Sequence, residues 1–189
     1  MGRSAAWLLA LAAVAMLAPC RAVASDAAWN ALKAGGVVAL MRHARAPGTG
    51  DPANFRLDDC ATQRNLSEAG RAQARRIGEA FRKRGVRVDS VLSSAWCRSR
   101  ETAQLAFGQA DVFAPLNSFF GQGRQEAEQT RQAAAAIAAW RGPGVLALVT
   151  HQVNITALTR AFPDEGEILV LQPDGSGFAL LGKITAIVP

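Results

Sequence analysis

The sequence contains few of the histidines and cysteines from which most zinc sites are built. It has two histidines and three cysteines among 189 residues, and their spacing matches no recognised zinc-ligand pattern. It also lacks a lysine-rich run and a ladder of aromatic residues on which bases could stack. We therefore expect no metal or other cofactor and no nucleic-acid partner.

Long apolar segments are equally scarce, and the only candidate for membrane insertion lies near the N-terminus. Arg3 precedes an apolar segment from Ala5 to Ala18, which is followed by the small residues of positions 22–24. This segment is shorter than the roughly 20 residues that a helix needs to cross a bilayer. The pattern predicts a signal peptide over residues 1–24 and an exported, periplasmic mature domain over residues 25–189, with no stable membrane anchor after cleavage.

The chain has a net charge of +6, and removal of residues 1–24 takes away two arginines but no acidic residue. Moderate positive charge favours anionic substrates and surfaces, and does not by itself indicate nucleic acid. Six basic residues cluster on one predicted helix, where we expect a solvated outer face: Arg71, Arg75, Arg76, Arg82, Lys83 and Arg84.

Signal cleavage also changes the cysteine inventory. Cys20 would leave with the signal, so that the mature chain keeps Cys60 and Cys97 in an oxidising compartment. Both follow predicted strands and are expected at the same edge of the sheet. We predict a disulfide between them, and two free buried thiols remain the alternative.

Apolar, strand-forming runs alternate with helical patterns, which indicates an α/β fold rather than a β-sandwich or a helix bundle. We predict one domain, a three-layer sandwich with a mostly parallel central sheet. The expected strands are 37–41, 88–92, 111–113 and 145–149, followed by a closing hairpin of 168–171 and 178–184. The expected helices are 27–33, one that opens at 67–68, 98–107 and about 125–140.

The two histidines each follow an expected strand directly. His43 comes after 37–41, and His151 comes after 145–149. The loops that leave the carboxyl ends of parallel strands meet at one edge of an open sheet. Arg42 beside His43, and Arg98 after the 88–92 strand, should reach the same edge. The sequence thus predicts a site of two histidines and two arginines.

Four segments resemble the histidine phosphatase superfamily, in its phosphoglycerate mutase-like branch with small bacterial phosphohistidine phosphatases. They occur in the order and at the spacing of that family's motifs. Residues 40–44 are similar to its Arg-His-Gly signature, and residues 66–74 to its Leu-Thr-x-x-Gly-x-x-Gln-Ala segment. Residues 93–103 resemble its second arginine motif, and residues 150–151 its second histidine segment.

These residue types suit phosphoryl transfer. An unprotonated imidazole nitrogen can attack phosphorus and form a phosphohistidine, so we assign His43 as the nucleophile. Arg42 and Arg98, with a protonated His151, would hold the phosphoryl group and stabilise its developing charge without a metal ion. The predicted activity is that of a histidine acid-type phosphatase acting on a small phosphorylated substrate or a phosphorylated envelope component.

Two departures from the family pattern bear on the substrate. Ala44 replaces the signature glycine and is expected to narrow the site. Residues 116–119, around Asn117, replace a glutamate that often protonates the leaving oxygen in the family. The proton donor is therefore unassigned. Asp58, Asp59 and Glu126 are candidates from loops, or the substrate could have a good leaving group that needs little acid help.

Other functions remain open at this level. The same fold could hold phosphate or an anionic envelope ligand without catalysis. A serine hydrolase that uses Ser93 or Ser94 is less favoured, because no Gly-x-Ser-x-Gly elbow is present. The sequence leaves the natural substrate and the oligomeric state undetermined.

Overall fold

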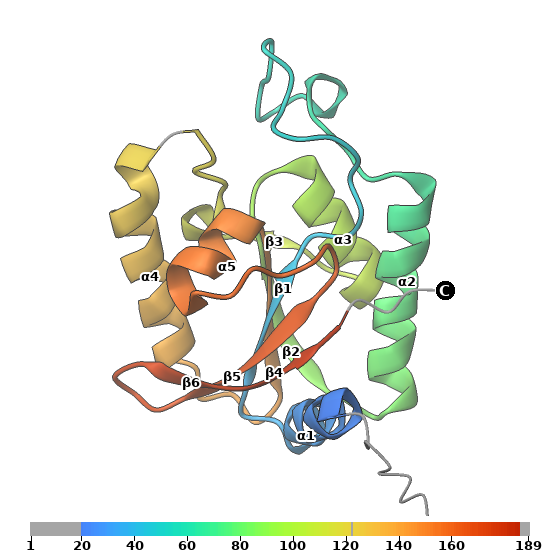
Figure 1. Cartoon of the computed structure of the whole chain (residues 1–189), viewed down its shortest axis with the longest axis vertical. Coiled ribbons are helices and arrows are strands. Elements are labelled where there is room, and N and C mark those ends of the chain that lie inside the picture. The colour runs from blue at the N-terminus through green and yellow to red at the C-terminus, as the bar shows by residue number, and fades with distance from the viewer. Residues whose placement is uncertain (1–19, 122, 186–189) are drawn as a thin grey trace, which may run out of the picture.

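The computed structural model describes residues 20–121 and 123–185, which form a central sheet with helices on both faces (Figure 1). Six strands lie in the order β3-β2-β4-β1-β5-β6. Strands β1 to β4 pair in parallel, β5 runs antiparallel to β1, and β6 runs antiparallel to β5. The strands are β1 Val38–Arg42, β2 Val88–Ser93, β3 Asp111–Val112, β4 Val145–Thr150, β5 Ile168–Pro173 and β6 Phe178–Ile184. The predicted mostly parallel sheet and closing hairpin are confirmed.

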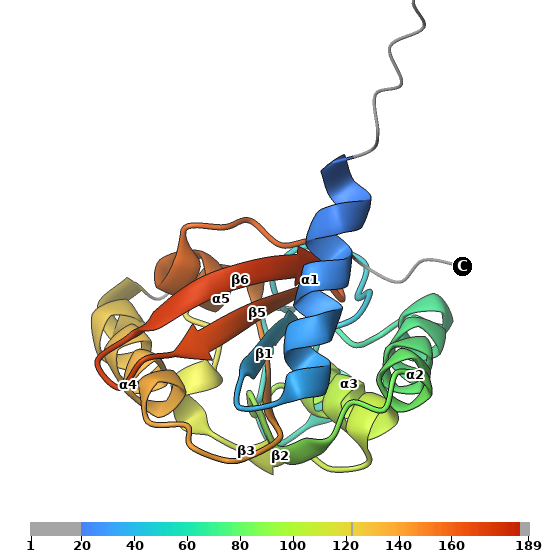
Figure 2. The same cartoon turned by 90° about the horizontal axis from the view of Figure 1, so that it is seen from below.

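The helices form the two outer layers, as expected. Helices α1 Cys20–Ala34, α2 Glu68–Lys83 and α3 Cys97–Phe107 cover one face, and α4 Glu126–Ala138 and α5 Gln152–Thr159 cover the other (Figure 2). Three short 3-10 helices are η1 Cys60–Thr62, η2 Ala114–Leu116 and η3 Gly123–Gln125. The sequence pattern missed α5, because this helix is only 8 residues long and shows no extended apolar stripe.

The strands at the centre of the sheet are apolar on both faces. In β4, Leu146 and Leu148 join the hydrophobic cluster under α4 and α5, whereas Val145, Ala147 and Val149 join the cluster under α1, α2 and α3. All six residues of β4 are buried. Burial on both faces explains why this strand reads as a continuous apolar run rather than an alternating one.

Helix α2 shows why the motif residues 66–74 occur together. Its N-cap, Ser67, accepts a hydrogen bond from the backbone of Gly70, which satisfies one of the first free N–H groups of the helix. A Cβ at Gly70 would lie 2.1 Å from the carbonyl oxygen of Arg45, so only glycine lets the helix approach so closely. Gln73 then joins two loops, because its amide accepts from the Arg45 N–H and donates to the Glu165 carbonyl. These residues build the frame of the site.

The N-terminal expectation falls largely outside the described residues. The apolar segment 5–18 is not among them, and the predicted cleavage point after residue 24 lies within α1. Among residues 20–121 and 123–185, every helix is too short or too polar to cross a bilayer.

Candidate active site

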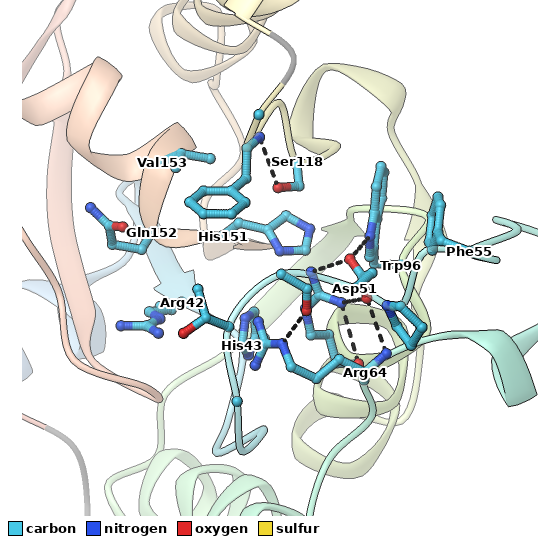
Figure 3. A pocket seen from close by; sticks show the side chains of 17 residues that line it. Arg42, His43, Asp51, Phe55, Arg64, Trp96, Ser118, His151, Gln152 and Val153 are labelled. Atoms are coloured by element: carbon cyan, nitrogen blue, oxygen red, sulfur yellow. Dashed lines mark hydrogen bonds and ion pairs between the residues drawn. The ribbon is translucent and has the colours of Figure 1, made fainter.

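The register of two neighbouring strands brings the histidines together. Arg42, the last residue of β1, lies opposite Thr150, the last residue of β4. His43 therefore follows β1 beside the point where His151 follows β4, and the His43 N–H donates to the Thr150 carbonyl at 2.9 Å. The two ring centroids are 5.4 Å apart, and the residues are 2% and 4% exposed (Figure 3). The predicted meeting of the two imidazoles at one sheet edge is confirmed.

The tautomer of His43 is set by its neighbour. Its Nδ1 lies 2.8 Å from the carbonyl oxygen of Ala44, which can only accept a hydrogen bond, so Nδ1 carries the proton. Nε2 then keeps its lone pair. Burial, reinforced by the nearby Arg98, Arg64 and Arg42, lowers the pKa of His43 to about 3, against a hydrogen bond to Ala44 that raises it. His43 is thus a neutral imidazole with Nε2 available as a nucleophile.

His151 is also buried and contacts two serines. Its Nε2 is 2.8 Å from the Ser94 hydroxyl and 3.5 Å from the Ser99 hydroxyl. Burial lowers the pKa of His151 well below its usual value, and the positive charges of the nearby arginines add to that effect. The expected protonated His151 is therefore not the form favoured in the ligand-free protein. A bound phosphoryl dianion would act in the opposite direction and raise this pKa.

Arg98, near the start of α3, is held at one end of its guanidinium. Its Nη1 donates to Asp51 Oδ1 at 2.8 Å and to the Arg64 carbonyl at 3.2 Å, and its Nη2 donates to Asp51 Oδ2 at 3.3 Å. The side chain is only 3% exposed, yet its Nε has no hydrogen-bond partner. A buried, unpaired donor of this kind is costly unless a ligand uses it.

Arg42 repeats the arrangement on the other side. Its Nη1 donates to the Pro163 carbonyl at 2.9 Å, and its Nη2 lies 3.8 Å from Glu165 Oε1. Its Nε is again buried without a partner. Protein acceptors therefore fix the outer part of both guanidinium groups, and each arginine keeps a buried Nε–H that has no protein partner. Planar guanidinium groups with free N–H donors are well suited to phosphoryl oxygens.

These four residues line one cavity of about 530 Å³. We call Arg42, His43, Arg98 and His151 the floor of the cavity. The rest of the lining comes largely from the segments 48–55 and 118–121, with Arg64 and Trp96. In Figure 1 the first of these segments belongs to the long loop that projects beyond the carboxyl edge of the sheet.

Two lining residues that the sequence did not reveal as functional are Asp51 and Arg64. Asp51 accepts the Arg98 guanidinium, the Trp96 indole Nε1–H at 3.0 Å and the Arg64 backbone N–H at 3.0 Å. Although burial opposes the charge, the hydrogen bond from Arg98 lowers the pKa of Asp51. Arg64 donates to the backbone carbonyls of Ala46 and Gly50, and burial lowers its pKa. Both residues lie far in sequence from the strand ends, so the rule that placed the other site residues could not place them.

A disulfide anchors the loop that carries them. Cys60 and Cys97 are bonded, with their Cα atoms 5.8 Å apart, which confirms the predicted pairing. Gln63 adds a second link, because its side-chain oxygen accepts from the Cys97 N–H at 3.0 Å. The bridge therefore joins η1 to the residue between Trp96 and Arg98.

The two departures from the family pattern have structural explanations. Ala44 does not narrow the cavity as expected, because its side chain packs with Ala46, Leu66 and Ala74. Asn117 stands where the family glutamate was expected, and its side chain holds the loop after β2 in place. Its side-chain oxygen accepts from the Ala95 N–H at 2.8 Å and lies 3.4 Å from the Ser94 hydroxyl.

The other candidate groups lie away from the reaction centre. Asp58, Asp59 and Glu126 do not line the cavity. Asp59 caps η1 and pairs with Arg56. Ser93 and Ser94 are fully buried and also outside the lining, which disfavours a serine nucleophile. Among the described residues, no group of three or more histidine, cysteine and acidic side chains is placed to hold a metal ion.

Comparison with known proteins agrees with this geometry. Residues 38–118 match the sequence model of the histidine phosphatase superfamily (branch 1). A comparison with curated proteins finds no match. A structure described as the phosphohistidine phosphatase SixA of Agrobacterium tumefaciens is 25% identical, with a TM-score of 0.53, and the match covers 80% of this chain and 98% of that one.

Two further solved structures share the fold. The protein histidine phosphatase SixA complexed with tungstate is 16% identical, with a TM-score of 0.50 over 79% of this chain and 97% of its own. The mycobacterial glucosyl-3-phosphoglycerate phosphatase is 19% identical, with a TM-score of 0.54 over 77% of this chain and 97% of its own. Over residues 38–118 the chain is similar to the histidine phosphatase superfamily, and this similarity supports phosphatase activity in general.

Proposed function

We propose that the protein is a metal-independent phosphatase that hydrolyses phosphomonoesters through a phosphohistidine on His43. The observation that carries this proposal is the state of the floor. A neutral imidazole with a free Nε2 lies in the same cavity as two arginines whose buried Nε–H groups have no partner. A phosphoryl group bound between these two guanidinium groups would place phosphorus before the nucleophile.

The reaction would proceed in two displacements. His43 Nε2 forms a bond to phosphorus while the bond from phosphorus to the leaving oxygen breaks. Arg42 and Arg98 stabilise the charge on the equatorial oxygens. Water then attacks the phosphohistidine, which releases inorganic phosphate and restores neutral His43. The Ala44 carbonyl holds the Nδ1 proton throughout, so that the ring keeps one reactive nitrogen.

The similar proteins give the proposal limited support. SixA is named as a phosphohistidine phosphatase, and one SixA structure contains tungstate, an oxyanion like phosphate. The signal-like segment of residues 1–24 supports export to the periplasm. Phosphorylated envelope components and small phosphate esters would be within reach there.

The test is a phosphatase assay of the chain from residue 25 onward in the presence of a chelator. We expect phosphate release that His43→Ala abolishes, while circular dichroism and thermal unfolding show that the variant remains folded. Full activity of His43→Ala would refute the proposal. Tungstate binding by the unaltered protein without any turnover would instead support the non-catalytic phosphate-binding alternative.

A further inference from the structure

We infer that the substrate is an aryl phosphate, in which a flat aromatic ring carries the phosphoryl group on a weakly basic oxygen. This inference rests on the proposed phosphatase function and narrows its substrate class. Two observations carry it: the aromatic lining beyond the floor, and the absence of an available acid from the lining.

The cavity changes character from its floor to its mouth. Three aromatic side chains line the outer part, and we call Phe55, Trp96 and Phe120 the aromatic wall. The neutral polar side chains in the lining are Thr49, Ser118 and Gln152. The three rings offer contact area to a flat apolar leaving group.

The wall begins directly beside the floor. Trp96 packs edge to face with His151, with ring centroids 5.4 Å apart and an interplanar angle of 76°. Phe55 stacks on Trp96 at 5.3 Å and 16° (Figure 3). A ring attached to a phosphoryl group on the floor would therefore meet an aromatic surface immediately.

Phe120 supplies a ring from the other lining segment. It lines the cavity and is 58% exposed. Its Cε1 atom would lie 3.8 Å from a Cβ built on Gly50, so Phe120 stands close to the loop of residues 48–51. Its exposed face is available to a substrate ring.

The lining also lacks an acid to protonate a poor leaving group. All fifteen acidic residues belong to the described part of the chain, and Asp51 is the single one that lines the cavity. Its two oxygens are occupied by Arg98, Trp96 and the Arg64 N–H. Arg98 keeps the pKa of Asp51 low, so this carboxylate is ionised and positions Arg98 rather than donating a proton.

An aryl leaving group removes the need for that acid. As His43 Nε2 bonds to phosphorus, the phosphorus–oxygen bond breaks and the oxygen departs with the electron pair as a phenolate. The phenolate later takes a proton from water. A phenol loses its proton near pH 10, far below an ordinary alcohol, so a phenolate can leave unassisted. An alkoxide would forgo the roughly 10²- to 10⁴-fold help that a general acid gives.

Four substrates separate the two parts of the inference. 4-Nitrophenyl phosphate has a ring and a good leaving group, and benzyl phosphate has a ring and a poor one. Acetyl phosphate has a good leaving group without a ring, and glycerol 3-phosphate has neither. We expect kcat for benzyl phosphate to be at least about a hundredfold below that for 4-nitrophenyl phosphate. We expect KM to be lower for both ring compounds than for the other two.

A Phe120→Leu substitution tests the wall itself. We expect KM for 4-nitrophenyl and benzyl phosphate to rise about fivefold, the size of one lost aromatic contact, with little change for acetyl phosphate. The matched control is Phe162→Leu, because Phe162 is 76% exposed and outside the cavity lining. The control should leave all four KM values unchanged.

The outcomes distinguish this inference from the proposed function. Acetyl phosphate hydrolysis that depends on His43 tests the phosphatase function alone. If that reaction occurs but Phe120→Leu changes no KM, or glycerol 3-phosphate is turned over as fast as 4-nitrophenyl phosphate, the aryl phosphate inference is wrong and the phosphatase function stands. If no substrate is hydrolysed, both fail.

Discussion

The floor of the cavity and the loop that surrounds it are built in different ways. Arg42, His43 and His151 sit at or directly after the ends of two adjacent strands, where backbone pairing fixes their positions. Asp51 and Arg64 belong to the long loop between β1 and α2, which hydrogen bonds and one disulfide hold in place. The residues of the floor act on the phosphoryl group. The loop orients the Arg98 guanidinium and lines the part of the cavity that would receive the rest of the substrate.

Arg98 connects these two regions, because it lines the cavity while Asp51 and the Arg64 carbonyl hold its guanidinium. If this division is correct, changes in the loop should alter orientation and affinity, whereas changes in the floor should remove the reaction. The following expectations separate the two regions, from the largest effect to the smallest.

Removal of the disulfide with Cys60→Ser and Cys97→Ser should have the largest effect on stability. The bridge closes a loop of sequence separation 37, for which chain entropy gives about 4 kcal/mol. We expect urea unfolding to show a loss of that order, together with a higher KM because the loop loosens. A double variant as stable as the parent protein would mean that the hydrogen bonds alone hold the loop.

Arg98→Ala should reduce kcat/KM by at least about a hundredfold, because a buried guanidinium is lost from the charged phosphoryl group. Arg100→Ala is the matched control, since Arg100 lies on the same helix but is exposed and outside the lining. Steady-state kinetics of both variants make the test. Equal losses in the two variants would show that a general effect of charge is responsible.

Asp51→Asn should have a smaller effect on kcat, because it alters only the orientation of the Arg98 guanidinium. Asparagine preserves the size of the side chain but removes the charge that holds Arg98 at both oxygens. We expect kcat to fall about tenfold while KM stays level or decreases, because a negative charge near the phosphoryl site is removed as well. An unchanged kcat would show that the orientation of Arg98 does not depend on the charge of Asp51.

The pH dependence should show the smallest change in activity. Because His43 in the free enzyme has a pKa of about 3, it stays unprotonated as a nucleophile at pH 5. After correction for the substrate's own ionisation, we expect kcat/KM to vary less than about twofold between pH 5 and 7. A loss of activity with a midpoint near 6.5 would contradict the neutral, buried imidazole.

The free energy of unfolding, in contrast to kcat/KM, should depend on pH in this range. The folded-state pKa of His43 lies below its unfolded value of 6.5, so the unfolded chain binds more protons between pH 6.5 and 3. The free energy of unfolding should therefore be fully present above pH 6.5 and decrease as the pH falls. Urea titrations at several pH values measure this slope.

The sequence predicted the sheet, the disulfide and the convergence of the floor because each follows from a local rule. An apolar run predicts a strand, and a residue after a parallel strand is placed at a known edge. The loop between β1 and α2 follows no such rule, since it has no apolar periodicity to fix its course. Asp51 therefore gave no signal, although the sequence placed its partner Arg98 correctly.

Two other expectations concern properties that depend on the surroundings of a side chain. His151 was expected to be protonated while it holds the phosphoryl group, and in the ligand-free protein burial and the nearby arginines disfavour its charge. Ala44 was expected to narrow the cavity, but its side chain packs against α2 and the preceding loop. Residue type alone reveals neither the degree of burial nor the direction of a side chain.

The most direct test is the position of the phosphoryl group in the trapped intermediate. The enzyme should be mixed with 4-nitrophenyl phosphate, quenched with denaturant at alkaline pH, and analysed by ³¹P NMR and peptide mass spectrometry. Because the Ala44 carbonyl holds the Nδ1 proton of His43, phosphorus should be found on His43 and on Nε2. Phosphorus on Nδ1, on His151 or on a serine would contradict the account.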